Sequence, residues 1–360
     1  MVKTKMRVWT WLVPVLALGA LAAALIAGVG FGLALLCGAA LAGAVFVAVH
    51  HAEVVAQRVG EPFGTLVLAL AVTAIETALI LSMMFAGGED MAALPRDAIF
   101  AAVMIICTGV VGTCLLLGGL AHREQTFRVE GTGAGLAALI VMASLTLVLP
   151  AFTVTTPGAT YSNSQLEFVA VTLAVLWAAF VFVQTVRHRG YFLAPTDDPD
   201  PHAHATPPTK REAWASFGLL LLSLVTVVGL AKVLSPTIER AVAAANAPKA
   251  VVGIIIAGLV LLPETWAAAR AARANRLQTS MNLAVGSALA SIGLTVPLVV
   301  GASILFHLPL LLGLPPKEMA LLAVTFLVST VTLGAGRTFM MQGVVHLALF
   351  AAYLFFALVP

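Results

Sequence analysis

The chain has 360 residues, of which 61% are hydrophobic and only 10% are charged, whereas soluble domains carry about 25% charged residues. Apolar runs recur along the whole length, so the composition excludes a soluble protein and predicts a polytopic membrane protein. The net charge of +3 is small, and the placement of the charges is more informative than their sum.

Eleven apolar runs predict an all-α membrane protein of about eleven transmembrane helices. The runs are continuously apolar rather than alternating, which favours helices over a β-barrel, and several are near the ~20 residues that a spanning helix needs. A second run follows the first at once, so we expect the first run to be a retained helix and not a signal peptide. The predicted spans are 8–27, 30–49, 62–86, 97–120, 133–150, 165–186, 214–235, 249–268, 279–305, 317–334 and 340–359.

Lys and Arg are distributed unequally between the two predicted sides of the membrane. With the N-terminus inside, fourteen of the 19 basic residues lie on the cytoplasmic side and five on the other. Since cytoplasmic loops carry the excess of Lys and Arg, we expect a cytoplasmic N-terminus and a periplasmic C-terminus in a bacterial inner membrane.

One polar stretch, 187–213, interrupts the spans and predicts a mobile cytoplasmic linker rich in Asp, His and Pro. His202 and His204 could bind a transition metal as a pair, but a solvated linker is the favoured interpretation. The chain then divides into 1–29, an N-terminal segment with an extra helix, and two five-helix halves, 30–186 and 214–360. An odd number of helices in each half predicts an inverted-topology repeat with a binding site where the halves meet.

Two acids lie well within apolar runs, Glu76 and Glu264, and each is on the second helix of its half. A carboxylate in hydrocarbon is costly and normally faces a protein interior or a water path. Thr73 precedes Glu76 by three residues and shares its helix face. Pro263 cannot donate a helix hydrogen bond, so the carbonyl of Leu259 should lose its partner.

The helix after each acid repeats a small pattern: a polar residue, glycine four residues on, then a hydroxyl residue. The first copy is Thr108, Gly112 and Thr113, and the second is Asn282, Gly286 and Ser287. The glycines would let backbones approach closely and present carbonyl oxygens to a cation. Ser291 and Thr295 offer further hydroxyls on the second of these helices.

Two carboxylates with hydroxyl and carbonyl oxygens suit a hard cation such as Ca²⁺. The same acids would hold protons when the cation leaves, so the chemistry predicts an exchanger in which Glu76 and Glu264 bind either cation or H⁺. The alternative is structural: one such acid can bridge helices, and the threonines can bond to their own backbone. The expected cation ligands are Glu76, Glu264, Thr73, Thr108, Thr113, Asn282, Ser287 and Ser291.

Several segments, taken together, resemble the bacterial calcium/proton antiporters of the cation/calcium exchanger superfamily. They are GEPFGTLVLALAVTAIE, CTGVVGTCLLLGG, LLPE with NRLQTSMNLAVGSALASIGLTVP, TTPGATYS and VFVQTVRHRGYF. The resemblance implies ten core helices in two inverted repeats, an acid in each signature region, and exchange of a cytoplasmic cation for protons. Some bacterial members also move Na⁺ or K⁺.

The chain departs from this family's pattern at two places. Related sequences usually have Asn at the position of Thr108 and Gly at that of Thr265. Threonine offers a hydroxyl where asparagine offers an amide carbonyl, and Thr265 with Trp266 makes the start of the expected loop bulkier. Both changes bear on ion preference and not on the class.

The sequence therefore predicts a secondary transporter that exports Ca²⁺ in exchange for H⁺ by alternating access, with a Na⁺ or K⁺/H⁺ antiporter as the alternative. We expect the lipid bilayer and the transported ions as its partners, with no cofactor, no nucleic acid and no enzymatic activity. Cys37, Cys107 and Cys114 lie within apolar runs, which argues against a disulfide framework or a zinc site.

Overall fold

The computed structural model describes residues 8–60, 63–193 and 208–359, apart from the side chains of 63–66. In these ranges eleven helical segments are long and apolar enough to cross a membrane, which confirms the all-α polytopic class. The α-helices are α1 Val8–Ala27, α2 Phe31–Val59, α3 Phe63–Gly87, α4 Leu94–Met104, α5 Val111–His122, α6 Val129–Ala143, α7 Asn163–Phe182, α8 Lys210–Ala244, α9 Ala250–Arg273, α10 Leu277–Ala290, α11 Val296–Phe306, α12 Pro316–Leu333 and α13 Met340–Leu358.

Four spans contain a π-helical segment, in which each backbone hydrogen bond joins residues five apart instead of four. The sequence did not predict these segments. They are η2 Ile105–Val110, η3 Ser144–Val148, η5 Val183–Arg187 and η7 Ser291–Thr295. Thus α4, η2 and α5 form a single span, as do α10, η7 and α11. Such segments occur often at functional sites because they turn backbone carbonyls out of the regular ladder.

Two helices extend well beyond their predicted spans. α2 continues ten residues past Val49 through His50, His51 and Glu53, and α8 continues through Pro236 to Ala244. Beyond Pro236 the helix is held by side chains: Ser235 Oγ donates to Glu239 Oε1 at 2.8 Å, and Arg240 Nε donates to the Pro236 carbonyl at 3.0 Å.

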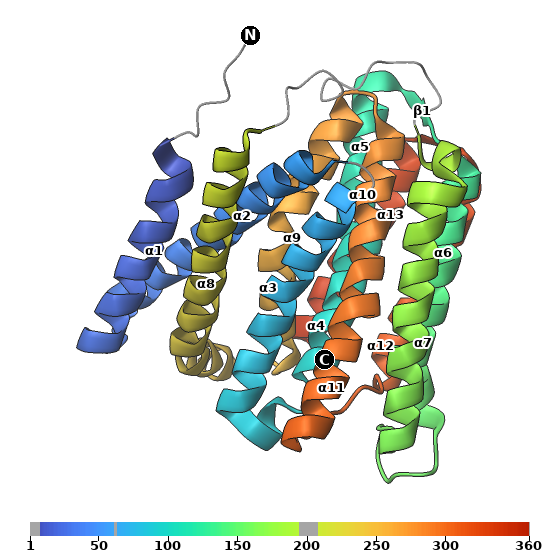
Figure 1. Ribbon diagram of the computed structural model, residues 1–360. Coiled ribbons are helices and arrows are strands. Elements are labelled where there is room, and N and C mark those ends of the chain that lie inside the picture. Colours follow the sequence, from blue (N-terminus) through green and yellow to red (C-terminus); the bar gives the residue numbers. More distant parts are fainter. Residues whose placement is uncertain (1–7, 61–62, 194–207, 360) are drawn as a thin grey trace. The chain divides into compact units, whose positions relative to one another are not determined.

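The described helices group into two compact units, each of which mixes segments from both predicted halves. The first contains α1, α2, α3 and α8, with α1, α2 and α8 side by side in Figure 1. A methyl group on Gly229 of α8 would lie 2.5 Å from Leu21 of α1, so glycine permits this contact. His51 of α2 bonds through Nε2 to the Thr10 carbonyl at 2.8 Å. The extra N-terminal helix is therefore an integral part of the first unit.

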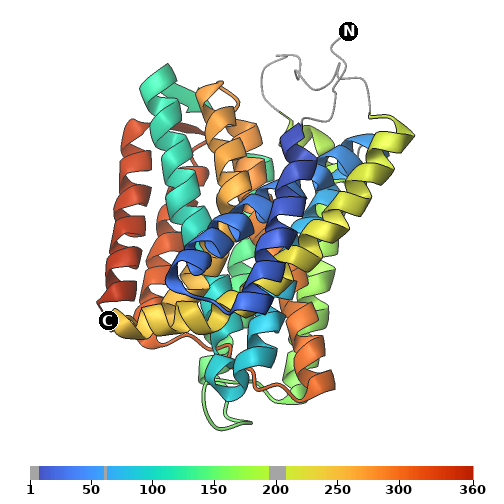
Figure 2. The same cartoon turned by 90° about the vertical axis from the view of Figure 1, so that its left-hand side faces the viewer.

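The second unit contains α4 to α7 and α9 to α13. Its most buried span runs from Leu94 to His122, where 83% of the most apolar stretch is buried, against 22% for Asn163–Arg187. Figure 2 shows α13 (red) beside α5 (teal). A short antiparallel ribbon joins the same region, with β1 Glu124–Thr126 paired to β2 Arg337–Phe339 so that Gln125 lies opposite Thr338.

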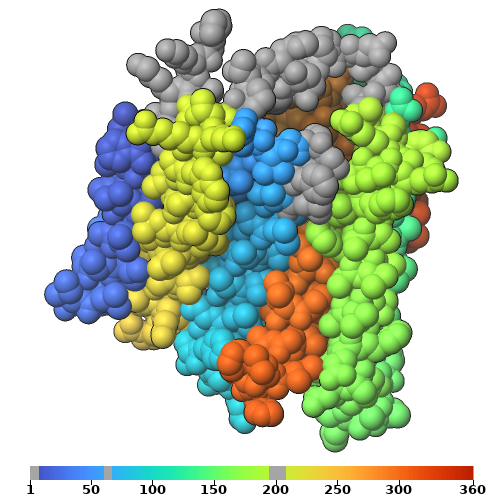
Figure 3. Space-filling view, in the orientation of Figure 1, coloured from blue at the N-terminus to red at the C-terminus, as the bar shows by residue number. Residues whose placement is uncertain are grey.

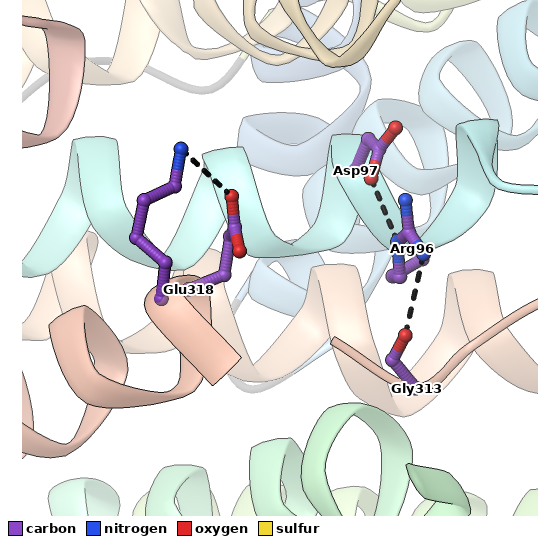
Figure 4. A network of polar contacts seen from close by, with 5 residues as sticks. Arg96, Asp97, Gly313 and Glu318 are labelled. Carbon is purple, nitrogen blue, oxygen red and sulfur yellow. Dashed lines mark hydrogen bonds and ion pairs between the residues drawn. The ribbon is translucent and has the colours of Figure 1, made fainter. Parts of the chain in front are cut away.

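A polar network holds the start of α4 to the chain that precedes α12. Arg96 Nε donates to Asp97 Oδ1 at 2.8 Å, and Arg96 Nη1 donates to the Gly313 carbonyl at 3.3 Å, as Figure 4 shows. Glu318 pairs with Lys317 at 3.4 Å nearby. These contacts fix the end of the second unit at which α4 and α12 begin.

α7 and η5, light green in Figure 3, carry a row of exposed large apolar side chains. Exposed apolar side chains at helical spacing, such as these, are what a lipid-facing helix presents. The row consists of Phe168, Val171, Val175, Phe182 and Val186.

The predicted mobile linker is wrong at both of its ends. Arg189–Phe192 form a 3₁₀ turn, and Phe192 is buried and packs edge-on against Phe180 with ring centroids 5.7 Å apart. At the other end, Lys210 to Ala213 belong to α8, and Thr209 caps this helix by accepting from the Glu212 N–H at 3.2 Å. His202 and His204, the proposed metal pair, lie outside the described residues.

Candidate cation site

The acid of the first unit is Glu76, in the second half of α3. Its side chain is only 5% exposed, and Thr73 and Thr77 are buried as well. The spacing of three and four residues places all three on one helix face. The Thr77 hydroxyl has no hydrogen-bond partner among the described residues. A carboxylate and two hydroxyls therefore share a buried face of α3, and sequence reasoning had named Thr73 but not Thr77.

The acid of the second unit is Glu264, half-buried on α9. The expected loop after this acid is wrong, because α9 continues unbroken through Pro263 and Glu264 to Arg273. The Thr265 hydroxyl donates to the Leu261 carbonyl at 2.7 Å, within the helix, and Trp266 is 66% exposed and points outward. Thr265 and Trp266 therefore do not crowd a loop.

Glu264 lies level with the stretch from Thr108 to Thr113 of the neighbouring span. α9 runs parallel to the span formed by α4, η2 and α5: a methyl group on Gly253 would lie 2.7 Å from the Asp97 backbone, and at the other end His122 Nε2 lies 2.9 Å from the Arg273 carbonyl oxygen. Counted from the first contact, Glu264 is level with Thr108, and counted from the second it is level with Thr113.

The Thr108 hydroxyl is engaged in its own helix, where it donates to the Met104 carbonyl. Its oxygen keeps lone pairs, but its proton is used in the bond to the helix backbone. This is the structural role that the sequence analysis gave as the alternative to cation binding. Thr113 lies just beyond on α5 and is half-buried. The backbone carbonyls of η2, which packs against α9, are therefore further candidate oxygens besides the threonine side chains.

The hydroxyl residues of α10 and η7 lie at different depths. Ser280 Oγ donates to the Ala268 carbonyl at 2.6 Å, which sets the register of α10 against the antiparallel α9. Counting back from this contact, Ser287 lies about 4 Å from the depth of Glu264, Ser291 about 10 Å and Thr295 about 16 Å. Only Ser287 of these three is brought close to the depth of Glu264.

The Asn282 amide is occupied by protein partners. Its Nδ2 donates to the Phe192 carbonyl at 2.6 Å, and its Oδ1 accepts from Gln278 Nε2 at 2.9 Å. Asn282 therefore anchors the 3₁₀ turn before residue 194 to α10. Its assignment as a cation ligand stays a prediction, and ligation would compete with these two bonds.

The glycines of the repeated pattern have different surroundings. A methyl group on Gly112 would lie 2.9 Å from His346 Cβ of α13, so this glycine does permit a close helix approach. Gly286 is different, because a methyl group there would meet no described atom within 4 Å. On α13, a methyl group on Gly343 would lie 2.4 Å from the Leu116 nitrogen. The expected close approach is wrong for Gly286, and at Gly112 it serves packing between α5 and α13.

This difference gives a stability prediction. We expect Gly343→Ala to lower the thermal unfolding midpoint of the detergent-purified protein, since overpacking costs about 1 to 3 kcal/mol. Gly286→Ala, the matched control in the same unit, has room for its methyl group and should leave the midpoint unchanged or slightly higher. Equal midpoints for the two variants would show that α5 and α13 do not pack as closely as described.

A residue that sequence reasoning missed is His346, a fully buried imidazole in α13 beside η2. The sequence could have indicated this residue, because an ionisable side chain within an apolar run is a candidate functional residue. Within the described residues, no group of three or more His, Cys, Asp or Glu side chains could hold a metal ion.

The model of the sodium/calcium exchanger protein family matches residues 29–186 and 215–359. The chain belongs to this family. It is therefore a membrane transporter and not an enzyme. This exchanger is 45% identical over 98% of its length to a Sinorhizobium fredii protein named as an ionic transporter, covering 96% of that protein.

Two further similarities support the assignment. The sodium-potassium/proton antiporter of Escherichia coli is 36% identical to this exchanger over 86% of the chain and 84% of its own length. The solved structure of native YfkE superposes with a TM-score of 0.76 at 17% identity, covering 98% of this chain and all of the other. This likeness shows that the two proteins share a fold over almost the whole chain.

Proposed function

We propose that the chain is a cation/proton antiporter that exports Ca²⁺ from the cytoplasm of a bacterial cell in exchange for protons, by alternating access. The observation that supports this most directly is an intramembrane acid at the same place in both family-matched stretches. Glu76 lies on the second helix of 29–186, and Glu264 lies on the second helix of 215–359. Five spans per stretch would give the two copies opposite orientations, with the N-terminus cytoplasmic and the C-terminus periplasmic.

The chemistry of exchange follows from the surroundings of the acids. An ionised carboxylate in a water-poor interior needs a cation beside it, and without one it is stabilised by taking up a proton. Hydroxyls accompany Glu76 on α3, and the backbone of η2 packs against α9, which carries Glu264. A site that holds either a cation or protons, and moves between the two sides in either form, performs antiport.

Ca²⁺ is the first candidate substrate because two exchanging carboxylates match its charge. Oxygen ligands from carboxylates, carbonyls and hydroxyls are those it prefers. The family is also described as sodium/calcium exchangers.

A monovalent cation is the second candidate, favoured by the Escherichia coli relative, which is named a sodium-potassium/proton antiporter. With Na⁺ or K⁺, one carboxylate could keep a proton while the other carries the ion, so the same oxygens would serve. Thr108, in place of the asparagine usual in related sequences, removes an amide carbonyl oxygen and bears on this choice.

Ion flux in proteoliposomes distinguishes the two candidates. With an imposed pH gradient and an interior pH dye, we expect addition of Ca²⁺ to release protons from the lumen at a rate that saturates with Ca²⁺. Parallel additions of Na⁺, K⁺ and choline identify monovalent transport, with liposomes lacking the protein as the leak control. Proton release by Na⁺ or K⁺ but not Ca²⁺ would select the second candidate, and no response to any of them would reject cation/proton antiport.

A further inference from the structure

His346 is a buried imidazole with a partner for each ring nitrogen. Its Nδ1 lies 2.7 Å from the Cys107 carbonyl oxygen, and its Nε2 lies 3.1 Å from Thr332 Oγ1. A carbonyl can only accept, so Nδ1 carries the proton of this bond. In the neutral ring Nε2 then accepts from the Thr332 hydroxyl. The side chain thus joins three helical segments, η2, α12 and α13.

The carbonyl that His346 binds belongs to the π-helical segment η2. In a regular α-helix the Val111 N–H would donate to the Cys107 carbonyl. Here that N–H donates to the carbonyls of Ile106 and Thr108 instead. The Cys107 carbonyl has lost its α-helical donor in the most enclosed span of the unit, where an unsatisfied polar group is costly. The His346 N–H takes the place of that donor.

The contact depends on a close approach between η2, α5 and α13. A methyl group on Gly109 would lie 3.3 Å from the Phe350 ring of α13, and a methyl group on Gly112 would meet His346 itself. A larger residue at either glycine would push α13 outward and lengthen the bond to Cys107. The two glycines therefore permit the approach that brings the His346 imidazole to the Cys107 carbonyl.

η2, which contains Cys107 and Thr108, packs against α9, the helix that carries Glu264. We propose that His346 is a positioning residue of the transport site: it holds the Cys107 carbonyl and so fixes the η2 oxygens beside the helix that carries Glu264. This inference rests on the proposed function, because it treats the surroundings of Glu264 as cation-binding. His346 acts through η2 and does not itself touch the ion.

Two conservative substitutions separate the bonds that His346 makes. His346→Asn places an amide N–H where Nδ1 was and keeps the donor to Cys107, but it is too short to reach Thr332. His346→Gln places its amide at the position of Nε2 and reaches Thr332, but it loses the donor to Cys107. Thr332→Val removes the second bond alone, and His346→Leu removes both.

The measurement is the rate of proton release from proteoliposomes against Ca²⁺ concentration, with Na⁺ and K⁺ in parallel, on the full chain. We expect His346→Asn and Thr332→Val to keep a half-saturating concentration near the wild-type value. His346→Gln and His346→Leu should raise it about tenfold to a hundredfold, the usual loss when a partner that orients a ligand is removed, with a smaller change in maximal rate. Thermal unfolding of each variant checks folding.

The outcomes separate this inference from the proposed function. Equal half-saturation for the Asn and Gln variants, or wild-type behaviour of the Leu variant, would overturn the positioning role while wild-type exchange stands. Loss of all exchange in His346→Asn would also overturn it, because the imidazole would then carry protons itself. If Gln and Leu do not fold, the Asn and Thr332→Val variants decide, since a tenfold weakening in either contradicts the proposal. Absence of exchange in the wild-type chain would instead reject the proposed function.

Discussion

Replacement of either Glu76 or Glu264 by glutamine is expected to abolish cation/proton exchange. Glutamine keeps the shape of the side chain but carries neither the negative charge that binds a cation nor the exchangeable proton. We expect the exchange rate to fall at least about a hundredfold, because removing a ligand should cost more than removing a residue that only orients one. Cation-driven proton release in proteoliposomes measures it, with expression and unfolding midpoint showing that each variant still folds.

Glu167→Gln is the matched control for these variants, since Glu167 is exposed near the start of α7. It should exchange at the wild-type rate. Aspartate at either acid keeps the charge but shortens the reach by one methylene, so partial activity with weaker affinity is expected. Near wild-type exchange in Glu76→Gln or Glu264→Gln would remove that residue from the mechanism.

Cation binding is expected to strengthen as the pH rises. In the proposed exchange, protons and cation compete for the two carboxylates, so a lower pH should favour the protonated, cation-free form and a higher pH the loaded one. If two protons leave for each divalent ion bound, affinity changes up to ~100-fold per pH unit while both acids are protonated in the empty protein, and then levels off. We expect the pair to titrate as a unit, so the pH dependence of cation affinity should belong to both acids together.

Binding of ⁴⁵Ca²⁺ to purified protein between about pH 5.5 and 9 tests this expectation. The double variant Glu76→Gln, Glu264→Gln serves as the control and should show neither strong binding nor the pH dependence. An affinity that does not change over this range would exclude proton–cation competition at these acids and, with it, the exchange mechanism proposed above.

The spans could be predicted from sequence because hydrocarbon requires long apolar helices with internally satisfied backbones. The ends of α2 and α8 could not, since a helix that continues past the hydrocarbon loses its apolar signal at residues such as His50 and Glu239. The π-helical segments were equally hidden. A π-helical segment leaves a backbone carbonyl without its usual donor, and the partner that takes its place at Cys107 is His346, 239 residues further along the chain.

The two acids of the candidate site could be predicted from the sequence because charge within an apolar run is rare. The other expected ligands were harder to predict. The hydroxyl of Thr108 donates within its own helix, and the Asn282 amide serves the Phe192 carbonyl. Side-chain type indicates which oxygens exist, but only packing decides which of them are already used.

The length of α8 limits how far this helix can shift through a membrane. Its stretch without charged side chains, Ala213 to Ala231, covers about 28 Å, close to the hydrocarbon thickness of ~30 Å. Charged side chains follow at both ends, with Lys210, Arg211 and Glu212 on one side and Lys232, Glu239 and Arg240 on the other. A slide of one turn in either direction would draw charged side chains toward the hydrocarbon, at up to about 2.5 to 3.5 kcal/mol each near the bilayer centre. The bilayer therefore opposes movement of α8 along its helix axis. Any movement of α8 during transport should be a tilt or a rotation.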